Sequence, residues 1–224
     1  MRINLKTRRE FLRRATGYLI SLGFLSSPVL LAIRTVFARA RKVLLPRSTK
    51  RESLINRNPA ELDPTNLEIT PVKDFGTMGL DDHKVDIDTW RLEVNGHVSR
   101  SLSLSYNEIT ALPSIEKAVL IICPGFFANY GQWKGISLKE LLQRAGSKNG
   151  ATHITFHGPQ SANEKSERYP LVDILSDKVF LAYQVNGKPL PERHGFPLRV
   201  VAEGYYGYSW IKYVYNVKVE KGTG

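Results

Sequence analysis

The stretch VLIICPGFFANYGQWKG, residues 119–135, holds the only cysteine of this 224-residue chain. The four apolar residues before Cys123 predict a buried strand, which runs directly into Pro124 and Gly125. Proline followed by glycine is typical of a turn, so the thiol is expected at the mouth of the strand. A single thiol held in that position is the first candidate functional group of the chain.

The segments on either side of this stretch predict more strands than helices. Strand patterns recur at residues 89–96, 101–104, 153–158, 178–191, 197–204 and 210–221. Ser137 and Glu140 have capping-box spacing, and Gly146 follows three leucines, so residues 137–146 predict a helix. Residues 105–113, with Ser105 and Glu108 at the same spacing, and residues 170–176 predict helical turns. Because strands and helices do not alternate regularly, the fold class is α+β or mostly β, and not doubly wound α/β.

The basic excess of the chain is confined to its N-terminal part. Residues 1–57 hold 14 of the 32 Lys and Arg residues but only 2 of the 21 Asp and Glu residues. The remaining 18 basic and 19 acidic side chains nearly cancel. Nucleic-acid binding needs a positive field on the folded part, so we expect no nucleic-acid partner.

Residues 1–40 resemble a twin-arginine export signal, with Arg8-Arg9 followed by Phe11 and Leu12 and then an apolar run from 18 to 33. That run of 16 residues is shorter than the roughly 20 that a membrane-spanning helix needs. The alternative is a cationic amphipathic helix at a membrane surface. We expect export to the periplasm, with cleavage at residues 38–40 or, without cleavage, an N-terminal membrane anchor. Residues 41–65, with three prolines, predict a linker or an arm, and residues 66–224 a single domain.

Three roles are open for Cys123. A free cysteine is most often a buried structural residue. A nucleophile, as in a cysteine hydrolase, needs a base, for which His153, His157 and His194 are available. The third role is a metal thiolate, which suits thiophilic metals. Zinc does not fit, because the chain has one cysteine and no ligand pairs at zinc spacing. A metal that takes one protein ligand, with an organic cofactor supplying the others, fits a single cysteine better.

Two blocks of sequence carry a family resemblance. The segments LIICPGFFANYGQWKGISLKELLQRAG and VNGKPLPERHGFPLRVVAEGYYGYSWIKYV resemble the oxidoreductase molybdopterin-binding domain, over roughly residues 66–221. This is the superfamily of sulfite oxidase, assimilatory nitrate reductase and the catalytic subunit of the periplasmic methionine-sulfoxide reductase. The resemblance implies a mostly β, mixed-sheet, sulfite-oxidase-type fold, a Mo-molybdopterin cofactor, and Cys123 as the catalytic metal ligand. The Trp133-x-Gly135 pair before a leucine-rich helix also matches the family pattern.

The resemblance also implies which residues bind the cofactor. Besides Cys123, the positions that match the family are His194, Arg199, Trp210, Ile211, Lys212 and, in a shorter match, Lys73 and Asp74. A phosphate monoester is well matched by an Arg fork and a Lys charge, which agrees with this set. The alternatives are that the two cations are strand-edge charges, that the histidine stabilises a turn, and that the aspartate is a solvated loop acid.

One departure from the family bears on the substrate. No cation lies between Cys123 and Trp133, so sulfite and nitrate would lack the arginine that sulfite oxidases place there. Aromatic residues are expected at the active site instead: Phe126, Phe127 and Tyr130, joined by Tyr205, Tyr206 and Tyr208. Such a wall favours a neutral, partly apolar small molecule.

The sequence therefore predicts an exported mononuclear molybdenum oxidoreductase. Its reaction would be a two-electron oxygen-atom transfer, such as reduction of an S-oxide or N-oxide, with electrons from a separate membrane or periplasmic partner. Membrane contact is expected only through an uncleaved N-terminal signal. The alternatives are a non-catalytic cofactor-binding or structural module with a buried Cys123, and a cysteine-nucleophile hydrolase.

Overall fold

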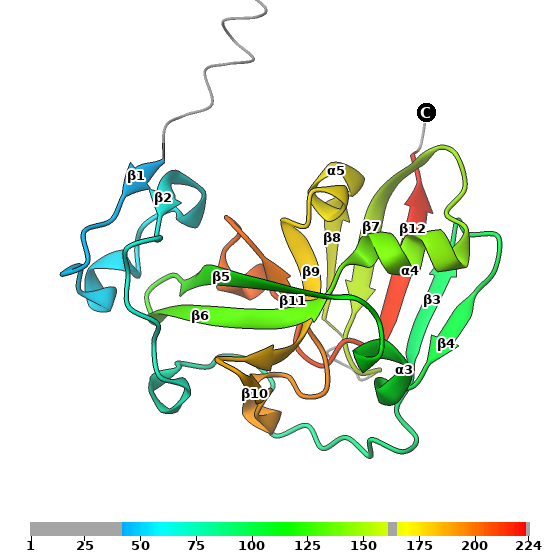
Figure 1. The fold of residues 1–224 in the computed structure, drawn as a ribbon, viewed down its shortest axis with the longest axis horizontal. Helices are drawn as coiled ribbons and strands as arrows, with labels where there is room; N and C mark the ends of the chain where they lie inside the picture. Colours follow the sequence, from blue (N-terminus) through cyan, green and yellow to red (C-terminus); the bar gives the residue numbers. More distant parts are fainter. Residues whose placement is uncertain (1–41, 161–164, 223–224) are drawn as a thin grey trace, which may run out of the picture. The chain divides into compact units, whose positions relative to one another are not determined.

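The fold of this protein is given by a computed structural model that describes residues 42–160 and 165–222 (Figure 1). The predicted export signal over residues 1–40 lies outside the described residues. None of the helices in the described ranges is both long enough and apolar enough to span a membrane.

The described residues form two five-stranded sheets and a small two-stranded one. In the first sheet the strand order is β4 (Leu102–Leu104), β3 (Leu92–Gly96), β12 (Asn216–Lys221), β7 (Ala151–His157) and β8 (Ser166–Pro170). In the second it is β10 (Lys188–Pro189), β9 (Val179–Val185), β6 (Phe127–Ile136) and β5 (Ser114–Cys123), with β11 (Arg199–Ala202) also paired to β9. β12 pairs with β3 in parallel and with β7 antiparallel, so the predicted α+β class with mixed sheets is confirmed.

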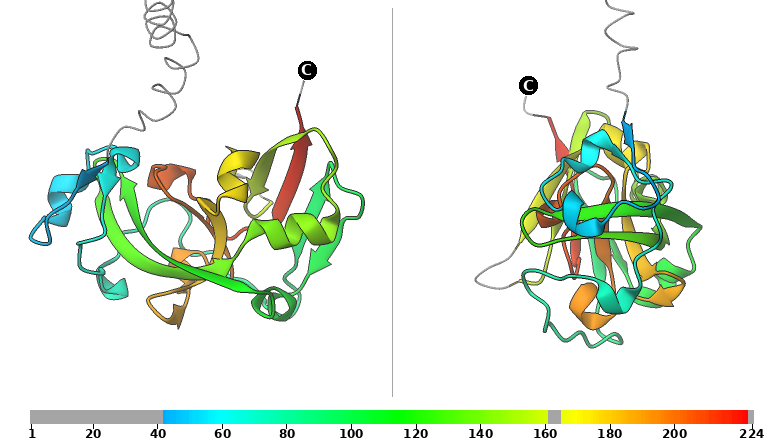
Figure 2. Two further views of the ribbon diagram at one scale, coloured as in Figure 1. Left: turned by 45° about the horizontal axis from the view of Figure 1, so that its top comes forward. Right: turned by 90° about the vertical axis from the view of Figure 1, so that its left-hand side faces the viewer.

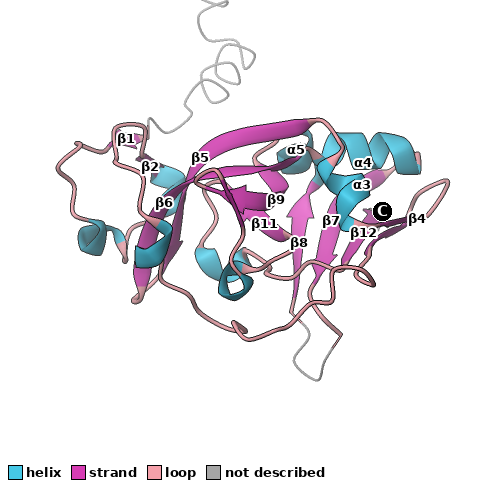
Figure 3. Cartoon of the chain, turned by 60° about the horizontal axis from the view of Figure 1, so that its bottom comes forward, coloured by secondary structure: helices cyan, strands magenta, loops and turns pink. Residues whose placement is uncertain are grey.

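Within residues 42–160 and 165–222, three short α-helices accompany the sheets: α3 (Tyr106–Thr110), α4 (Leu138–Ala145) and α5 (Leu171–Leu175). Figure 3 shows them beside the strands. The capping box of Ser105 and Glu108 forms at α3, as predicted. At α4, Gly146 caps the C-terminus with φ 65°, but the capping box predicted for Ser137 and Glu140 does not form. Glu140 pairs with Arg144 instead, while Ser137 alone accepts from the Lys139 N–H.

β5 and β6 form one long curved hairpin (Figure 2). The second half of β5 is apolar at successive positions because both of its faces are covered. Val119 and Ile121 face the main core, whereas Leu120 and Ile122 face a second apolar cluster. By alternation, Cys123 points to the same side as Ile121.

The second cluster forms where the N-terminal arm, residues 42–67, packs on β5 and β6. Four leucines at positions 45, 54, 62 and 67 are buried against β5 and β6. Burial of one such leucine side chain contributes about 1.5–3 kcal/mol. These residues lie in and around β1 (Val43–Leu44), β2 (Leu62–Asp63), and the 3-10 turns Arg51–Leu54 and Pro59–Glu61. The N–H of Gly125 donates to the Ile55 carbonyl at 3.2 Å, so this arm also holds the turn that follows Cys123.

β6 was not predicted from the sequence, and its glycines explain why. A Cβ on Gly135 would lie 1.9 Å from the carbonyl oxygen of Leu181 in β9. The glycine of Trp133-x-Gly135 is therefore required by the close approach of the neighbouring strand. The tryptophan is fully buried, and its Nε1 donates to the Val119 carbonyl at 3.2 Å. The motif locks β6 between β5 and β9.

The last predicted strand segment, residues 210–221, is only partly a strand. β12 begins at Asn216, and the backbone before it turns at Tyr213, which has φ 57°. Residues 210–215 instead run alongside β11 without forming a strand. There the Val200 N–H donates to Ile211 at 2.8 Å, and the Val214 N–H donates to Leu198 at 2.9 Å.

Candidate active site

Cys123 ends β5 at the wall of a cavity of about 530 Å³. Its side chain is buried, and its Sγ lies 3.1 Å from the Sδ of Met78. Burial raises the pKa of the thiol, and the nearby Lys165 ammonium opposes that shift. The thiol therefore keeps its proton at neutral pH unless a metal ion replaces the proton.

Arg199, the first residue of β11, is buried in the wall of the same cavity. Its guanidinium lies over Trp133 and Trp210, 5.0 and 5.6 Å from the ring centroids. One Nη donates to the His194 carbonyl at 3.0 Å, whereas Nε has no partner. Burial lowers the pKa of Arg199 to about 10, which still leaves the group charged.

Lys212 reaches the cavity from the segment beside β11. Its Nζ donates to Thr77 Oγ1 at 3.0 Å and to the Arg193 carbonyl at 3.2 Å. Burial, followed by repulsion from Arg199, lowers the pKa of Lys212 to about 8. Arg199 and Lys212 thus line one cavity and repel each other, and a bound anion would remove the free-energy cost of this repulsion.

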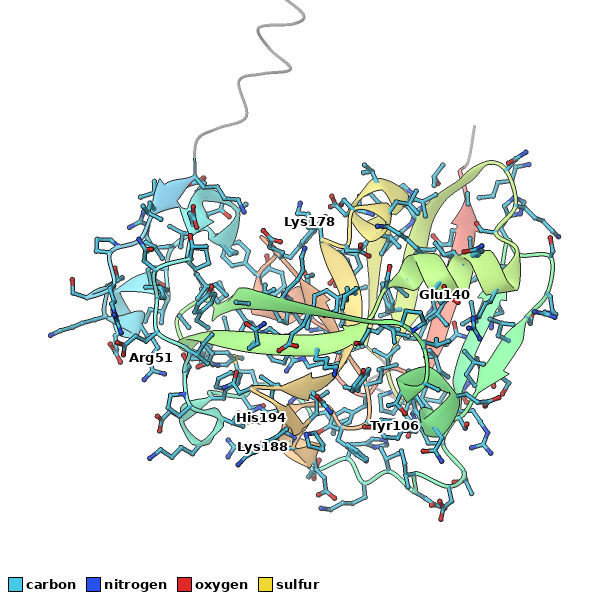
Figure 4. All side chains as sticks on the ribbon, viewed as in Figure 1. Arg51, Tyr106, Glu140, Lys178, Lys188 and His194 are labelled. Carbon is cyan, nitrogen blue, oxygen red and sulfur yellow. The ribbon has the colours of Figure 1, made fainter. Side chains whose placement is uncertain are left out.

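His194 ends the 3-10 turn Glu192–His194 after β10, and Figure 4 marks its position. The side chain is buried, and its ring contacts Phe75 edge to face at 5.8 Å. Burial and repulsion from Arg199 lower the pKa of His194 to about 4, so the imidazole is neutral at pH 7. It can donate or accept a hydrogen bond without adding a further charge.

No carboxylate lines the cavity among the described residues, although Lys165, Arg199 and Lys212 all do. Glu167 acts on Lys165 and Asp81 acts on Lys212 from outside the lining residues. Three cations in a wall without a carboxylate nevertheless favour an anion in this space. The unpartnered Nε of the buried Arg199 is a donor that a phosphate oxygen would satisfy. A thiol and an orphaned guanidinium in the wall of one cavity fit a group that carries both a thiophilic metal and a phosphate.

Most of the predicted site residues line the cavity, but three do not. Cys123, His194, Arg199, Trp210 and Lys212 line it. Ile211 is fully buried and does not line it; its carbonyl accepts from the Val200 N–H. Lys73 and Asp74 are exposed in a 3-10 turn and do not line it either, although residues 76–80, which follow them closely, do. The binding role of these residues stays a prediction.

The predicted aromatic wall is only partly present. Phe127 and Tyr208 line the cavity. Phe126 is 65% exposed, and Tyr130 is buried in the cluster under the N-terminal arm. Tyr205 and Tyr206 are not among the lining residues.

The lining residues that sequence reasoning missed include Thr77, Met78, Lys165 and Tyr213. Lys165 supplies a cation near Cys123 from the position just before β8, outside the stretch between Cys123 and Trp133, which holds no cation. Its Nζ donates to the Tyr208 carbonyl. Tyr213 follows Lys212 directly, but its left-handed backbone carried no signal in the sequence.

The hydrolase alternative is disfavoured by the state of the thiol. A nucleophilic cysteine has a pKa lowered by an adjacent base or cation, so that the thiolate is present. Here burial raises the pKa of Cys123, and its sulfur contacts the thioether of Met78.

Comparisons with known proteins show which family the chain is similar to. The family model of the oxidoreductase molybdopterin binding domain matches residues 79–223. The chain is 32% identical to mitochondrial sulfite oxidase of Rattus norvegicus, over 70% of this chain and 34% of the relative. It is 31% identical to the oxidoreductase YuiH of Bacillus subtilis, over 61% of this chain and 68% of the relative. It is 28% identical to the NAD(P)H nitrate reductase of Hordeum vulgare, over 61% of this chain and 18% of the relative.

Among solved structures, the sulfane dehydrogenase SoxCD from Paracoccus pantotrophus has a similar fold, with a TM-score of 0.58 and 21% identity. The match covers 65% of this chain and 44% of that one. The chain spans about a third of the length of the mitochondrial sulfite oxidase that it matches. With its fold, its cavity and these matches taken together, the chain belongs to the oxidoreductase molybdopterin-binding domain family and is a molybdopterin-dependent oxidoreductase with Mo-molybdopterin as its cofactor.

Proposed function

We propose that this protein is an exported mononuclear molybdenum enzyme that transfers an oxygen atom, with two electrons, to or from a small substrate. The observation that carries the proposal is the position of Cys123, whose buried sulfur faces one cavity together with Lys165, Arg199 and Lys212. The bound cofactor supplies the two-electron redox chemistry.

The residues of the chain hold and orient the cofactor. The Cys123 thiolate is the metal ligand. Binding to a metal displaces the proton that burial otherwise keeps on the sulfur. β5 is held between the main core and the N-terminal arm, so the sulfur position is rigid. Arg199 and Lys212 hold the phosphate end through charge-assisted hydrogen bonds.

The lining of the cavity favours a substrate with an apolar body and a polarised oxygen. Phe127, Leu80 and Tyr208 supply apolar surface, and Leu80 and Tyr208 are exposed. Lys165 supplies a cation near the thiol, and burial lowers its pKa. An S-oxide or N-oxide combines these two properties, since its oxygen carries partial negative charge that an ammonium can bind. We therefore assign the reductive direction to this enzyme.

Reoxidation of the reduced enzyme tests this assignment. Holoenzyme reduced with dithionite should be reoxidised by dimethyl sulfoxide or trimethylamine N-oxide, followed through its visible absorption. Sulfite should not reduce the oxidised enzyme at a comparable rate. Rapid reduction by sulfite with no response to either oxide would contradict the proposed direction, and no reaction with any of the three would favour a non-catalytic module.

Electrons for this reaction would come from a separate redox partner in the periplasm or in the membrane. The proposed route to that compartment is the N-terminal segment, where Arg8 and Arg9 stand in a twin-arginine pattern. We assign no nucleic-acid partner, because the basic excess lies within residues 1–57.

Changing Arg8-Arg9 to Lys-Lys should keep the protein in the cytoplasm. The substitution preserves charge and removes only the arginine pair that the export receptor reads. Fractionation of cells that express each form measures the distribution, and Arg13-Arg14 changed to Lys-Lys is the matched control, which should be exported normally. Unchanged export of the Arg8-Arg9 variant would rule out the twin-arginine route.

A further inference from the structure

Two of the residues that line the cavity carry a buried polar atom without a partner. In the described part of the chain, four buried side-chain polar atoms lack a hydrogen-bond partner: Trp90 Nε1, Thr155 Oγ1, Arg199 Nε and the hydroxyl of Tyr213. Only Arg199 and Tyr213 belong to the cavity wall. A buried donor without a partner is costly, so each such atom in a native fold needs an explanation.

The backbone holds the two residues side by side. Hydrogen bonds from Val200 to Ile211 and from Val214 to Leu198, at 2.8 and 2.9 Å, join the strand that carries Arg199 to the segment that carries Tyr213. A Cβ on Gly195 would lie 3.1 Å from the Cβ of Arg199 and 3.2 Å from the Cβ of Lys212, so the three segments meet closely.

Tyr213 also has an unfavourable backbone conformation. Its φ of 57° lies in the left-handed region, which bulky residues rarely adopt. The side chain is fully buried all the same. Such strain persists where the surroundings fix it, and it gathers at binding and active sites.

The electrostatics of Tyr213 suit a hydrogen-bond donor. Burial raises the pKa of its hydroxyl to about 12, so the proton stays on the oxygen at neutral pH. Arg199 acts on the hydroxyl in the opposite direction, which places the two groups within electrostatic range of each other. The Nζ of Lys212 lies 5.8 Å from the centre of the tyrosine ring.

We propose that the Tyr213 hydroxyl donates a hydrogen bond to an anionic oxygen at the phosphate end of molybdopterin, beside the Nε of Arg199. This assignment rests on the cofactor of the family and not on metal ligation by Cys123. The bound anion would satisfy both orphaned donors at once and would neutralise the charge that Arg199 and Lys212 concentrate there.

Tyr213→Phe tests the proposal by its opposite effects on the two forms of the protein. The variant should retain molybdopterin about 10- to 100-fold less well, measured as pterin content after gel filtration and dilution, since a hydrogen bond to a charged group is lost. The melting temperature of the cofactor-free protein should not fall, because the hydroxyl that is removed has no partner there.

Tyr215→Phe is the matched control. The hydroxyl of Tyr215 lies 3.0 Å from the Nε2 of His83, and this residue does not line the cofactor cavity. Its removal should lower the melting temperature of both forms and leave pterin retention unchanged. Normal retention by Tyr213→Phe would overturn the proposal, and so would a lower melting temperature of its cofactor-free form, which would show that the hydroxyl has a partner within the protein.

Discussion

Cys123→Ser is expected to lower turnover by more than about 100-fold while most of the pterin stays bound. Loss of a partner that only orients a metal ligand commonly costs 10- to 100-fold, so loss of the ligand itself should exceed that range. Serine has nearly the same shape, but its oxygen is a harder donor and a poorer match for a thiophilic metal. In the proposed site, molybdopterin would be held mainly by the cations and hydrogen-bond donors of the cavity, which this change leaves in place.

The same sample separates ligation from a structural role. A merely structural Cys123 would give a serine variant with a modestly lower melting temperature and full activity. Ile121→Val, on the same side of β5, is the control for packing. It should cost about 0.5–1.5 kcal/mol of stability and leave molybdenum content and turnover unchanged. Full turnover by Cys123→Ser would refute the metal-thiolate assignment.

Replacing Arg199 and Lys212 together by alanine should weaken cofactor retention by about two to four orders of magnitude. In the proposed site, each cation would make a charge-assisted hydrogen bond to the anion worth about 1.5–3 kcal/mol, and every 1.4 kcal/mol is a factor of ten. Folding should suffer much less, because both groups pay for burial without an acidic partner in the cavity. Pterin content after gel filtration measures retention, and thermal melting of the cofactor-free protein measures folding.

The control for this pair is another lysine and arginine at a distance from the cavity. Lys139 and Arg144 lie on α4, half exposed, and pair with Asp177 and Glu140. Surface pairs of this kind contribute about 0–1 kcal/mol, so the double alanine variant should keep its cofactor and most of its stability. If the Arg199 and Lys212 variant also kept full molybdopterin, these two residues would be ordinary charges without a role in binding.

Local sequence signals predicted the elements that depend on neighbouring residues only. The capping box at Ser105, the glycine at the end of α4 and the strand before Cys123 all form as expected. β6 escaped prediction because Gly131 and Gly135 interrupt its pattern. They are there because Phe75 and β9 approach its backbone, and such long-range contacts leave no periodic trace in a sequence.

The site residues likewise fall into those that local sequence blocks indicate and those that only the tertiary structure brings in. Cys123, His194, Arg199 and Lys212 could be named beforehand because they fall in two compact sequence blocks. Lys165 and Tyr213 could not, since their roles come from tertiary structure. Lys165, which lies just before β8, acts on Cys123, and Tyr213 has a left-handed backbone conformation that no turn motif in the sequence indicates. Residues 41–65 were predicted as a linker or an arm, but no local pattern indicated that Leu45, Leu54 and Leu62 pack on the strand that carries Cys123.

Metal ligation by Cys123 is the central claim, and X-ray absorption at the molybdenum K edge tests it most directly. The measurement compares purified holoenzyme with Cys123→Ser loaded to the same molybdenum content. The predicted result is one fewer sulfur neighbour around molybdenum in the variant, with an oxygen neighbour in its place. An equal number of sulfur neighbours in the two spectra would contradict the assignment, because the only cysteine of the chain would then contribute nothing to the metal.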